Sequence, residues 1–255
     1  MKIPVSVAII TKNEEKNIRD ALESVKDFEE IVVIDSFSED TTVQICSEYT
    51  GKIFQCQWQG FARQKQLAID KTTLPWVLVL DADERVTEAL KKEIRYKINE
   101  DKDGYFIPRK NFFLGKWIKH SGWWPDYTLR LFKKSKGKMQ KRQVHEKILV
   151  EGKVGHLKEP LLHYTYHSID DFIRKMKSYA CLAAEEIVKN NPSQYKIIFR
   201  MIFSPLFTFF KMYILRAGFL DGLRGFILAV LYSFYSFLKY AEAWEKYGNR
   251  KTIQN

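Results

Sequence analysis

The sequence WVLVLDADE, residues 76–84, is a continuous apolar run that ends in three carboxylates. A strand that is apolar at nearly every position is buried on both faces, as in a parallel sheet that helices cover on each side. Side chains that follow such a strand lie at its carboxyl end, where open α/β sheets bind their ligands. The stretch therefore predicts an α/β fold with an acidic ligand site at one edge of its sheet.

The preceding segments repeat this alternation of strand and helix. Apolar runs predict strands at residues 5–10, 31–34 and 53–57, and the sequence between them predicts helices at residues 14–25, 42–49 and 62–70. Polar clusters at residues 11–15 and 35–40 follow the first two strands, as residues 81–84 follow the fourth. We therefore expect a mostly parallel, Rossmann-like sheet with helices on both faces and the three clusters gathered at its edge.

Asp81 and Asp83 lie two positions apart at the end of the fourth strand, so both carboxylates can share one divalent cation. Mg²⁺ or Mn²⁺ prefers oxygen ligands and keeps coordination positions open for a diphosphate. Such a cation would neutralise the charge that develops on a departing nucleotide diphosphate. A solvated turn explains an isolated pair of this spacing as well, but the position directly after a buried strand favours a metal site.

Asp35 follows the second apolar strand in the same way. A carboxylate at that point can accept a hydrogen bond from the N–H of a nucleotide base. The alternative is a turn or helix-capping aspartate, an interpretation that suits Asp40 with Thr41 better.

Three segments resemble, in order, the signatures of family 2 inverting glycosyltransferases, which have the GT-A fold: SVAIITKNEE at residues 6–15, IDSFSEDT at 34–41 and DADE at 81–84. The resemblance implies that Thr11, Asn13 and Glu14 line the nucleotide cleft and that Asp35 reads the base. It also implies that Asp83 contributes most directly to metal binding. The chain departs from the pattern at Ser36, where many members carry a second acidic residue.

A narrower resemblance extends over later segments: WQGFARQK at 58–65, WWPD at 123–126, LRLF at 129–132, VHE at 144–146 and YILRAGFLDG at 213–222. These look like the bacterial lipopolysaccharide-core β-1,4-glucosyltransferases. The resemblance implies a hexosyltransferase that uses UDP-glucose and a lipid-linked saccharide of the inner core as acceptor. Related enzymes with nearly the same motifs use other hexoses, or build other cell-surface glycans.

Inversion at an anomeric carbon requires a base for the acceptor hydroxyl. Asp126 is the leading candidate, because its place before the LRLF segment resembles the acidic position that serves as base in the family. A surface aspartate paired with Arg130 at i+4 is the alternative. Glu146 competes for the same role, and His145 can complete the metal shell.

Basic side chains near the predicted site can face the diphosphate. Arg63 and Lys65 flank Gln64 on a predicted helix, and Arg130 follows Asp126. A solvated helical face is the alternative for the first two. His163 and His167 have helical i, i+4 spacing, but without a third ligand they do not predict a zinc site.

Charge divides the chain into two halves. Of 42 basic and 31 acidic residues, residues 1–100 hold 14 and 18, a net −4, which leaves a net +15 for residues 101–255. The second half is therefore expected to meet an anionic partner, and a membrane surface fits the implied acceptor. Three cysteines in no metal-like spacing indicate a reducing compartment, and the first residues lack the features of a signal peptide. We expect a protein at the cytoplasmic face of the inner membrane, held there peripherally.

The C-terminal region is expected to contact the membrane without crossing it. Its longest uncharged apolar run, residues 226–238, has 13 residues, short of the roughly 20 that a spanning helix needs. Arg200, Pro205 and Lys211 interrupt the run at 197–215 and predict shorter interfacial helices. We expect a catalytic domain at 1–190, divided into nucleotide-sugar binding at 1–100 and acceptor binding at 101–190, and a helical amphipathic extension at 191–255. A helical pair packed on the catalytic domain or on a second subunit is the alternative, so a homodimer stays open.

The sequence lacks the loops that are typical of other classes of nucleotide-binding enzyme. A sugar nucleotidyltransferase would need a Gly-rich, Arg-containing loop after the first strand, and a dehydrogenase would need GxGxxG after a strand. A non-catalytic nucleic-acid- or membrane-binding module would suit the basic second half. It would leave three acidic clusters at strand ends unexplained, so we predict no nucleic-acid partner.

Overall fold

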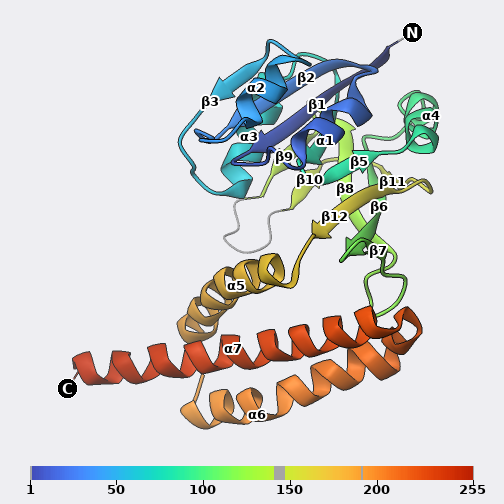
Figure 1. Cartoon of the computed structure of the whole chain (residues 1–255). Coiled ribbons are helices and arrows are strands. Elements are labelled where there is room, and N and C mark those ends of the chain that lie inside the picture. The colour runs from blue at the N-terminus through green and yellow to red at the C-terminus, as the bar shows by residue number, and fades with distance from the viewer. Residues whose placement is uncertain (1, 141–146, 191, 255) are drawn as a thin grey trace. The chain divides into compact units, whose positions relative to one another are not determined.

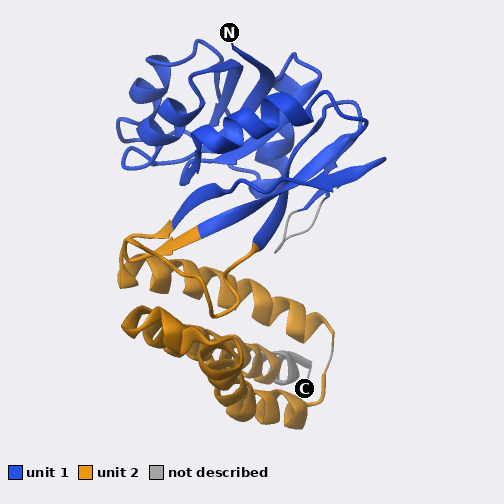
Figure 2. Cartoon of the chain, turned by 90° about the vertical axis from the view of Figure 1, so that its right-hand side faces the viewer, with its two compact units in different colours: residues 1–110, 126–164 blue, residues 111–125, 165–255 orange. Residues whose placement is uncertain are grey.

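The computed structural model describes residues 2–140, 147–190 and 192–254 (Figure 1). The chain forms two compact units (Figure 2). Unit 1 comprises residues 1–110 and 126–164, and unit 2 comprises residues 111–125 and 165–255. The boundary expected at residue 190 lies within unit 2, between two of its helices.

The first half of unit 1 is a parallel sheet in the order β3-β2-β1-β4. Its strands are β1 (Ile3–Thr11), β2 (Phe28–Asp35), β3 (Ile53–Gln55) and β4 (Trp76–Asp81), and its helices are α1 (Ile18–Val25), α2 (Thr42–Ser47) and α3 (Phe61–Lys71). The predicted alternation is confirmed. The first helix begins at Ile18 rather than at residue 14, because residues 14–17 form a turn in which the Glu14 carbonyl accepts from the Asn17 amide at 2.9 Å.

The second half of the sheet is mainly antiparallel, although β11 (Val154–His156) pairs with β6 (Gly104–Phe113) in parallel, so the expectation of a mostly parallel sheet holds for the β3-β2-β1-β4 half alone. β8 (Asp126–Lys133) pairs with β4 and with β6, and β12 (Leu161–Tyr166) pairs with β5 (Glu84–Val86). Two consecutive strands can pair in parallel only when a connection of a dozen or more residues, usually a helix, joins them, whereas antiparallel strands can be joined by a short turn. The α/β architecture itself is confirmed. The remaining elements are α4 (Glu88–Lys97), β7 (Lys116–Trp117) and the pair β9 (Gly137–Met139) and β10 (Ile148–Val150).

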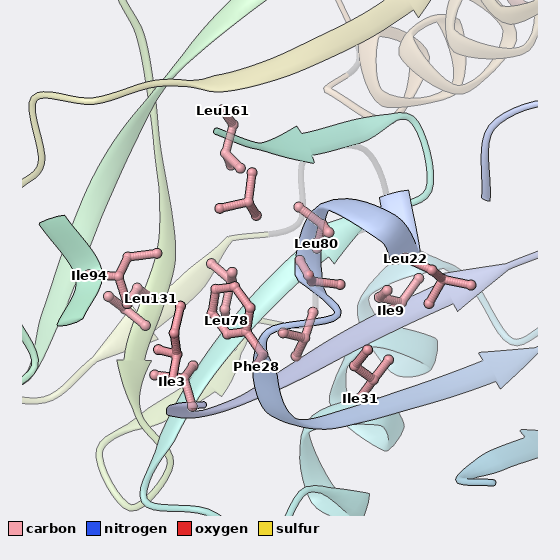
Figure 3. Close-up of a cluster of buried hydrophobic side chains, with 14 of the residues drawn as sticks. Ile3, Ile9, Leu22, Phe28, Ile31, Leu78, Leu80, Ile94, Leu131 and Leu161 are labelled. Carbon is pink, nitrogen blue, oxygen red and sulfur yellow. The ribbon is translucent and has the colours of Figure 1, made fainter. Parts of the chain in front are cut away.

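Apolar side chains bury both faces of the parallel strands. Successive side chains of a strand point to opposite faces. Ile3 and Ile9 of β1 therefore join Leu78 and Leu80 of β4 in one cluster, whose labelled members Figure 3 shows. Ala8 and Val79 belong to the cluster on the other face. With both faces covered, the carboxyl ends of the strands are left as the place for polar side chains.

Glu30 is a buried carboxylate in β2, and its replacement tests the packing of this sheet. It accepts from the amide and the hydroxyl of Thr73, each at 2.8 Å, and it contacts Ser6 and Lys52. Burial favours the neutral acid, but these partners outweigh it and lower the pKa of Glu30 to about 2. Glu30→Gln is expected to lower the free energy of unfolding by about 2 kcal/mol at neutral pH, since hydrogen bonds to charged groups are lost.

The sign of the pH dependence follows from the lowered pKa. The charged form of Glu30 is favoured in the folded state, so its contribution is complete above the usual value of 4.5 and declines as the pH falls toward about 2. Urea unfolding of the wild type and Glu30→Gln at several pH values measures this difference. Glu29→Gln, on the exposed side of the same strand, is the control. An unchanged difference at acid pH would contradict the assignment.

Unit 2 is mainly helical. It contains α5 (Ile169–Lys189), α6 (Gln194–Phe210), the π-helical turn η1 (Lys211–Leu215), the 3-10 turn η2 (Gly218–Asp221) and α7 (Leu223–Gln254). Its core joins Phe113 and Ile118 to Phe172 of α5 and Leu228 of α7. The buried Asp221 accepts from the amides of Lys119 and His120, which ties residues 111–125 to the helices.

The expectation that Pro205 interrupts the helix at 197–215 is wrong. α6 continues through Pro205, and with η1 it gives 22 helical residues, Gln194–Leu215, which contain an 18-residue window of mean hydropathy 1.5 that is 11% buried. By length and composition this segment could cross a membrane. Counting uncharged runs alone overlooked it, because Arg200 and Lys211 lie within an otherwise apolar helix.

Candidate active site

The predicted nucleotide-binding loops meet at the carboxyl ends of β1 and β2. Asp35 is fully buried and accepts from the Thr11 hydroxyl at 3.0 Å and from the Ser38 amide at 2.9 Å. Asn13 has a positive φ of 54° and accepts from the Glu39 amide at 2.9 Å. These contacts bring the first two polar clusters together, as expected. In this state the Asp35 carboxylate holds the loop, and its role in reading a base stays a prediction.

Glu14 takes part in the same group of hydrogen bonds between the loops after β1 and β2. Its amide donates to the Thr42 hydroxyl at 2.8 Å, and its carboxylate accepts from the Asn17 side chain at 2.9 Å. On α3, Gln64 donates to the Ser36 hydroxyl at 3.2 Å, so Ser36 contributes to packing beside Asp35. The loops after β1 and β2 are thus held by side chains from α2 and α3.

A continuous series of alternating charges runs from the tip of β4 to the start of β8. Lys65 Nζ lies 2.8 Å from Asp81 Oδ1, and Arg130 contacts Asp81 Oδ2. The same guanidinium lies 2.7 Å from Glu84 Oε1. Arg109 joins Glu84 at 3.4 Å to Asp126 Oδ2 at 2.6 Å. We call this series the charge network; its members are Lys65, Asp81, Arg130, Glu84, Arg109 and Asp126.

Burial and attraction oppose each other in the charge network. Partial burial of Asp81 favours its neutral form, but Coulombic attraction by Arg130 and Lys65 outweighs this burial and holds the pKa of Asp81 well below its usual range. Burial likewise opposes the charge of Arg130, yet Asp81 and Glu84 raise the pKa of this guanidinium. Asp81 and Arg130 are therefore charged at neutral pH, and each depends on its neighbours to stay so.

Asp126 is held by an arginine, but not by the one considered from the sequence. Its Oδ2 accepts from Arg109 Nε at 3.0 Å and from Nη2 at 2.6 Å. Asp126 and Arg130 lie on a strand, so the helical i+4 pairing with Arg130 does not form. Instead, Arg109 lies directly opposite Asp126 in the register of β6 and β8. The Asp126 side chain is one-third exposed, and it can therefore meet an acceptor.

Asp83 faces His163, which the sequence marks only by its i, i+4 spacing to His167. Its Oδ2 lies 3.4 Å from His163 Nε2, and its carbonyl accepts from the Tyr164 amide at 2.9 Å. The antiparallel pairing of β12 with β5 places His163 opposite Glu84, one residue from Asp83. Within residues 2–140, 147–190 and 192–254 no group of three or more His, Cys, Asp and Glu side chains could hold a metal. His145 and Glu146 lie outside the described residues.

Two further sequence candidates separate in the structure. Lys65 is buried against Asp81, whereas Arg63, two residues earlier on α3, is exposed and lies outside the charge network. Positions i and i+2 of a helix do not face the same way.

Trp123 packs edge-on against Phe113 and Tyr232 in the core of unit 2. Core packing therefore accounts for Trp123.

The comparisons with known proteins agree with this arrangement. The sequence profile of Glycosyl transferase family 2 matches residues 6–158, which contain the loops after β1 and β2, the carboxylates of β4 and β5, and Asp126. The chain belongs to glycosyltransferase family 2.

This family 2 glycosyltransferase has relatives that match it nearly end to end. It is 31% identical over 258 residues to "Lipopolysaccharide core biosynthesis glycosyltransferase LpsC" of Rhizobium meliloti (strain 1021), covering 97% of this chain and 94% of the relative. It is 28% identical to an uncharacterized glycosyltransferase of Rickettsia felis, covering 98% and 92%. Among solved structures, S. aureus TarS 1-349 in complex with UDP-GlcNAc covers 98% of this chain and 92% of that chain, at 16% identity and a TM-score of 0.48. The glycosyltransferase is thus an enzyme of the predicted family with an α/β fold.

Proposed function

We propose that this glycosyltransferase moves a hexose, with inversion, from UDP-glucose to a lipid-linked saccharide of the lipopolysaccharide inner core. The observation that carries the proposal is the charge network, which connects residues after β4 to an exposed carboxylate, Asp126. The similarity to LpsC supports the acceptor class. A lipid-linked acceptor places the enzyme at the cytoplasmic face of the inner membrane, as a peripheral protein.

In this proposal Asp126 is the base. Arg109 holds one oxygen of the carboxylate with two hydrogen bonds and so fixes its orientation. Asp126 would accept the proton of the acceptor hydroxyl as the oxygen attacks the anomeric carbon, while the bond from that carbon to the diphosphate breaks.

The residues after β4 fit a divalent cation, Mg²⁺ or Mn²⁺. Asp83 supplies a carboxylate oxygen and His163 an imidazole nitrogen, and the two atoms lie 3.4 Å apart, close enough to share one ion. Both side chains are largely buried but keep some exposure to solvent. The bound ion would neutralise charge on the departing diphosphate. Both carboxylate oxygens of Asp81 contact positively charged side chains, those of Lys65 and Arg130. In this proposal Asp81 therefore positions these two side chains toward the diphosphate.

His163→Ala tests the metal site. We expect the Mn²⁺ concentration for half-maximal transfer to rise roughly 10- to 100-fold, because Asp83 loses its partner for the ion. Initial rates across a Mn²⁺ titration measure the change. His156→Ala, an exposed histidine of unit 1, is the matched control. An unchanged Mn²⁺ dependence in His163→Ala would remove His163 from the site.

The whole proposal is tested by a transfer screen. Purified enzyme is incubated with UDP-, GDP- and dTDP-hexoses, with and without Mn²⁺ or Mg²⁺, and with core glycolipid from a strain that lacks this gene. Mass spectrometry should show a single added hexose from UDP-glucose, only with metal. Transfer from another sugar nucleotide would replace the donor, and transfer to a different surface glycan would replace the acceptor.

A further inference from the structure

A large apolar surface is exposed on the α6–α7 pair. On α6, Phe199 is 61% exposed and Leu206 is 66% exposed, the turn before α7 adds Leu220 at 61%, and the start of α7 adds Leu223 at 73%. We call this surface the apolar face; it comprises Phe199, Ile202, Phe203, Leu206, Phe207, Phe210, Ile214, Leu215, Phe219, Leu220, Leu223, Phe226, Val230, Phe234 and Phe237. A monomeric soluble protein rarely leaves so many large side chains exposed together.

The apolar face is continuous because each helix contributes one stripe to it. On α7 the exposed residues Leu223, Phe226, Val230, Phe234 and Phe237 are spaced three or four apart, which places them on one side of the helix. α6 lies along α7, where the Ser233 hydroxyl donates to the Pro205 carbonyl at 2.7 Å (Figure 1). Ile197 is the buried residue of α6, all of whose residues the structure describes. The helix thus turns most of its apolar surface outward.

Positive charge accompanies the apolar face. Between residues 194 and 241 the basic residues are Lys196, Arg200, Lys211, Arg216, Arg224 and Lys239, and the acidic residue is Asp221. Asp221 is buried and bound by two backbone amides, so it does not offset them at the surface. Exposed apolar side chains beside uncompensated cations are complementary to the headgroups and acyl chains of an anionic bilayer.

We propose that the apolar face inserts into one leaflet of an anionic membrane, with α6 and α7 lying in its plane. The proposal deepens the proposed function by naming the surface that meets the acceptor's membrane. A second copy of the chain fits less well, because a two-fold contact sets the same patch against itself and would oppose cations to cations.

A spanning arrangement of α6 conflicts with its neighbour α5. Ile197 near the start of α6 packs with Ala184 and Val188 of α5. Met212, after the end of α6, packs with Phe172 of α5. α7 packs against both α5 and α6, so α6 is joined through α7 to α5, which exposes charged residues along its length: Arg174, Lys175, Lys177, Glu185, Glu186 and Lys189. A spanning α6 would draw these charges into hydrocarbon, at high cost.

Vesicle flotation tests the proposal with the full chain. The triple variant Leu206→Ser, Leu220→Ser, Leu223→Ser is expected to lower partition onto phosphatidylethanolamine–phosphatidylglycerol vesicles by at least about 100-fold. Arg200→Gln with Lys211→Gln should instead reduce the preference for anionic over zwitterionic vesicles by about tenfold or more. Tyr96→Ser with Leu149→Ser, exposed apolar residues of unit 1, is the matched control. Circular dichroism establishes that each variant is folded.

Three outcomes would overturn the inference. The first is wild-type protein that does not float with anionic vesicles. The second is a triple variant that floats normally or that, in sedimentation without lipid, merely converts a dimer to a monomer. The third concerns topology. Two separate variants carry Lys196→Cys or Arg216→Cys, each in a protein that also has Cys56→Ser and Cys181→Ser. The new cysteine of each variant should react with a membrane-impermeant maleimide added outside the vesicles. Protection of one end would indicate a spanning helix.

Metal-dependent hydrolysis of UDP-glucose without lipid separates this inference from the proposed function. The triple variant should keep the wild-type hydrolysis rate, since the altered residues lie in unit 2 and the charge network lies in unit 1. Lost flotation with retained hydrolysis is the expected result. Normal flotation by a protein without hydrolysis would instead reject the proposed function and leave the membrane surface standing.

Discussion

Asp126→Asn is expected to lower the rate of sugar transfer roughly 10³-fold while leaving affinity for the sugar nucleotide nearly unchanged. The amide keeps the size of the carboxylate and can still meet Arg109, but it cannot accept the acceptor's proton. The effect should therefore appear in kcat rather than in the Kd for UDP-glucose. Single-turnover transfer and calorimetric titration of the nucleotide measure the two quantities separately.

The control for Asp126 is a carboxylate of unit 1 in an exposed ion pair. Asp101 pairs with Lys153 at 2.6 Å and is mostly exposed, so Asp101→Asn should transfer at the wild-type rate. If Asp126→Asn loses nucleotide affinity as much as it loses rate, Asp126 serves the donor rather than the acceptor. If it retains its rate, the base lies elsewhere, and Glu146 becomes the candidate.

Arg109 offers an independent check on this role. Arg109→Met removes both hydrogen bonds to Asp126 Oδ2 and the contact with Glu84. Because Arg109 orients Asp126, its loss should lower kcat and leave the Kd for UDP-glucose nearly unchanged.

The parallel half of the sheet could be predicted because its information is local. Each strand is a short apolar run such as residues 31–34 or 77–80, buried on both faces and ended by a polar loop. The topology then places the loop ends at one edge, so Thr11 and Asp35 meet although 24 residues separate them. Open α/β sheets bind ligands beyond the carboxyl ends of their strands, and this rule predicted the edge at which these polar side chains gather.

The antiparallel half could not be predicted, because its contacts depend on register. Arg109 lies opposite Asp126, and His163 lies opposite Glu84, only because β6 pairs with β8 and β12 pairs with β5 at particular offsets. A one-residue shift would turn each side chain to the other face of the sheet. No local pattern around His163 marks that partner, and its i, i+4 spacing to His167 bears only on a zinc site, which it does not predict.

Asp83→Asn should remove metal stimulation and lower transfer on the order of 10³-fold, since several kcal/mol of stabilisation of the leaving diphosphate would be lost. The expected reason is that an amide oxygen is a weaker ligand than the carboxylate that lies beside His163. Transfer rates and UDP binding are measured with and without Mn²⁺. Metal-stimulated transfer that survives in Asp83→Asn would sink the proposed metal site.

Asp81→Asn is the comparison that distinguishes the two aspartates. Its side chain offsets Lys65 and Arg130, so its loss leaves buried cations uncompensated and should lower the free energy of unfolding by roughly 3 kcal/mol. Because the folded state holds the pKa of Asp81 well below its usual value of 3.8, that difference is complete above this pH and declines as the pH falls below it. Asp83→Asn should lower the free energy of unfolding less, because Asp83 lies 3.4 Å from His163 whereas Asp81 contacts both Lys65 and Arg130. One aspartate of the pair would then hold the positive side chains in place, while the other binds the ion.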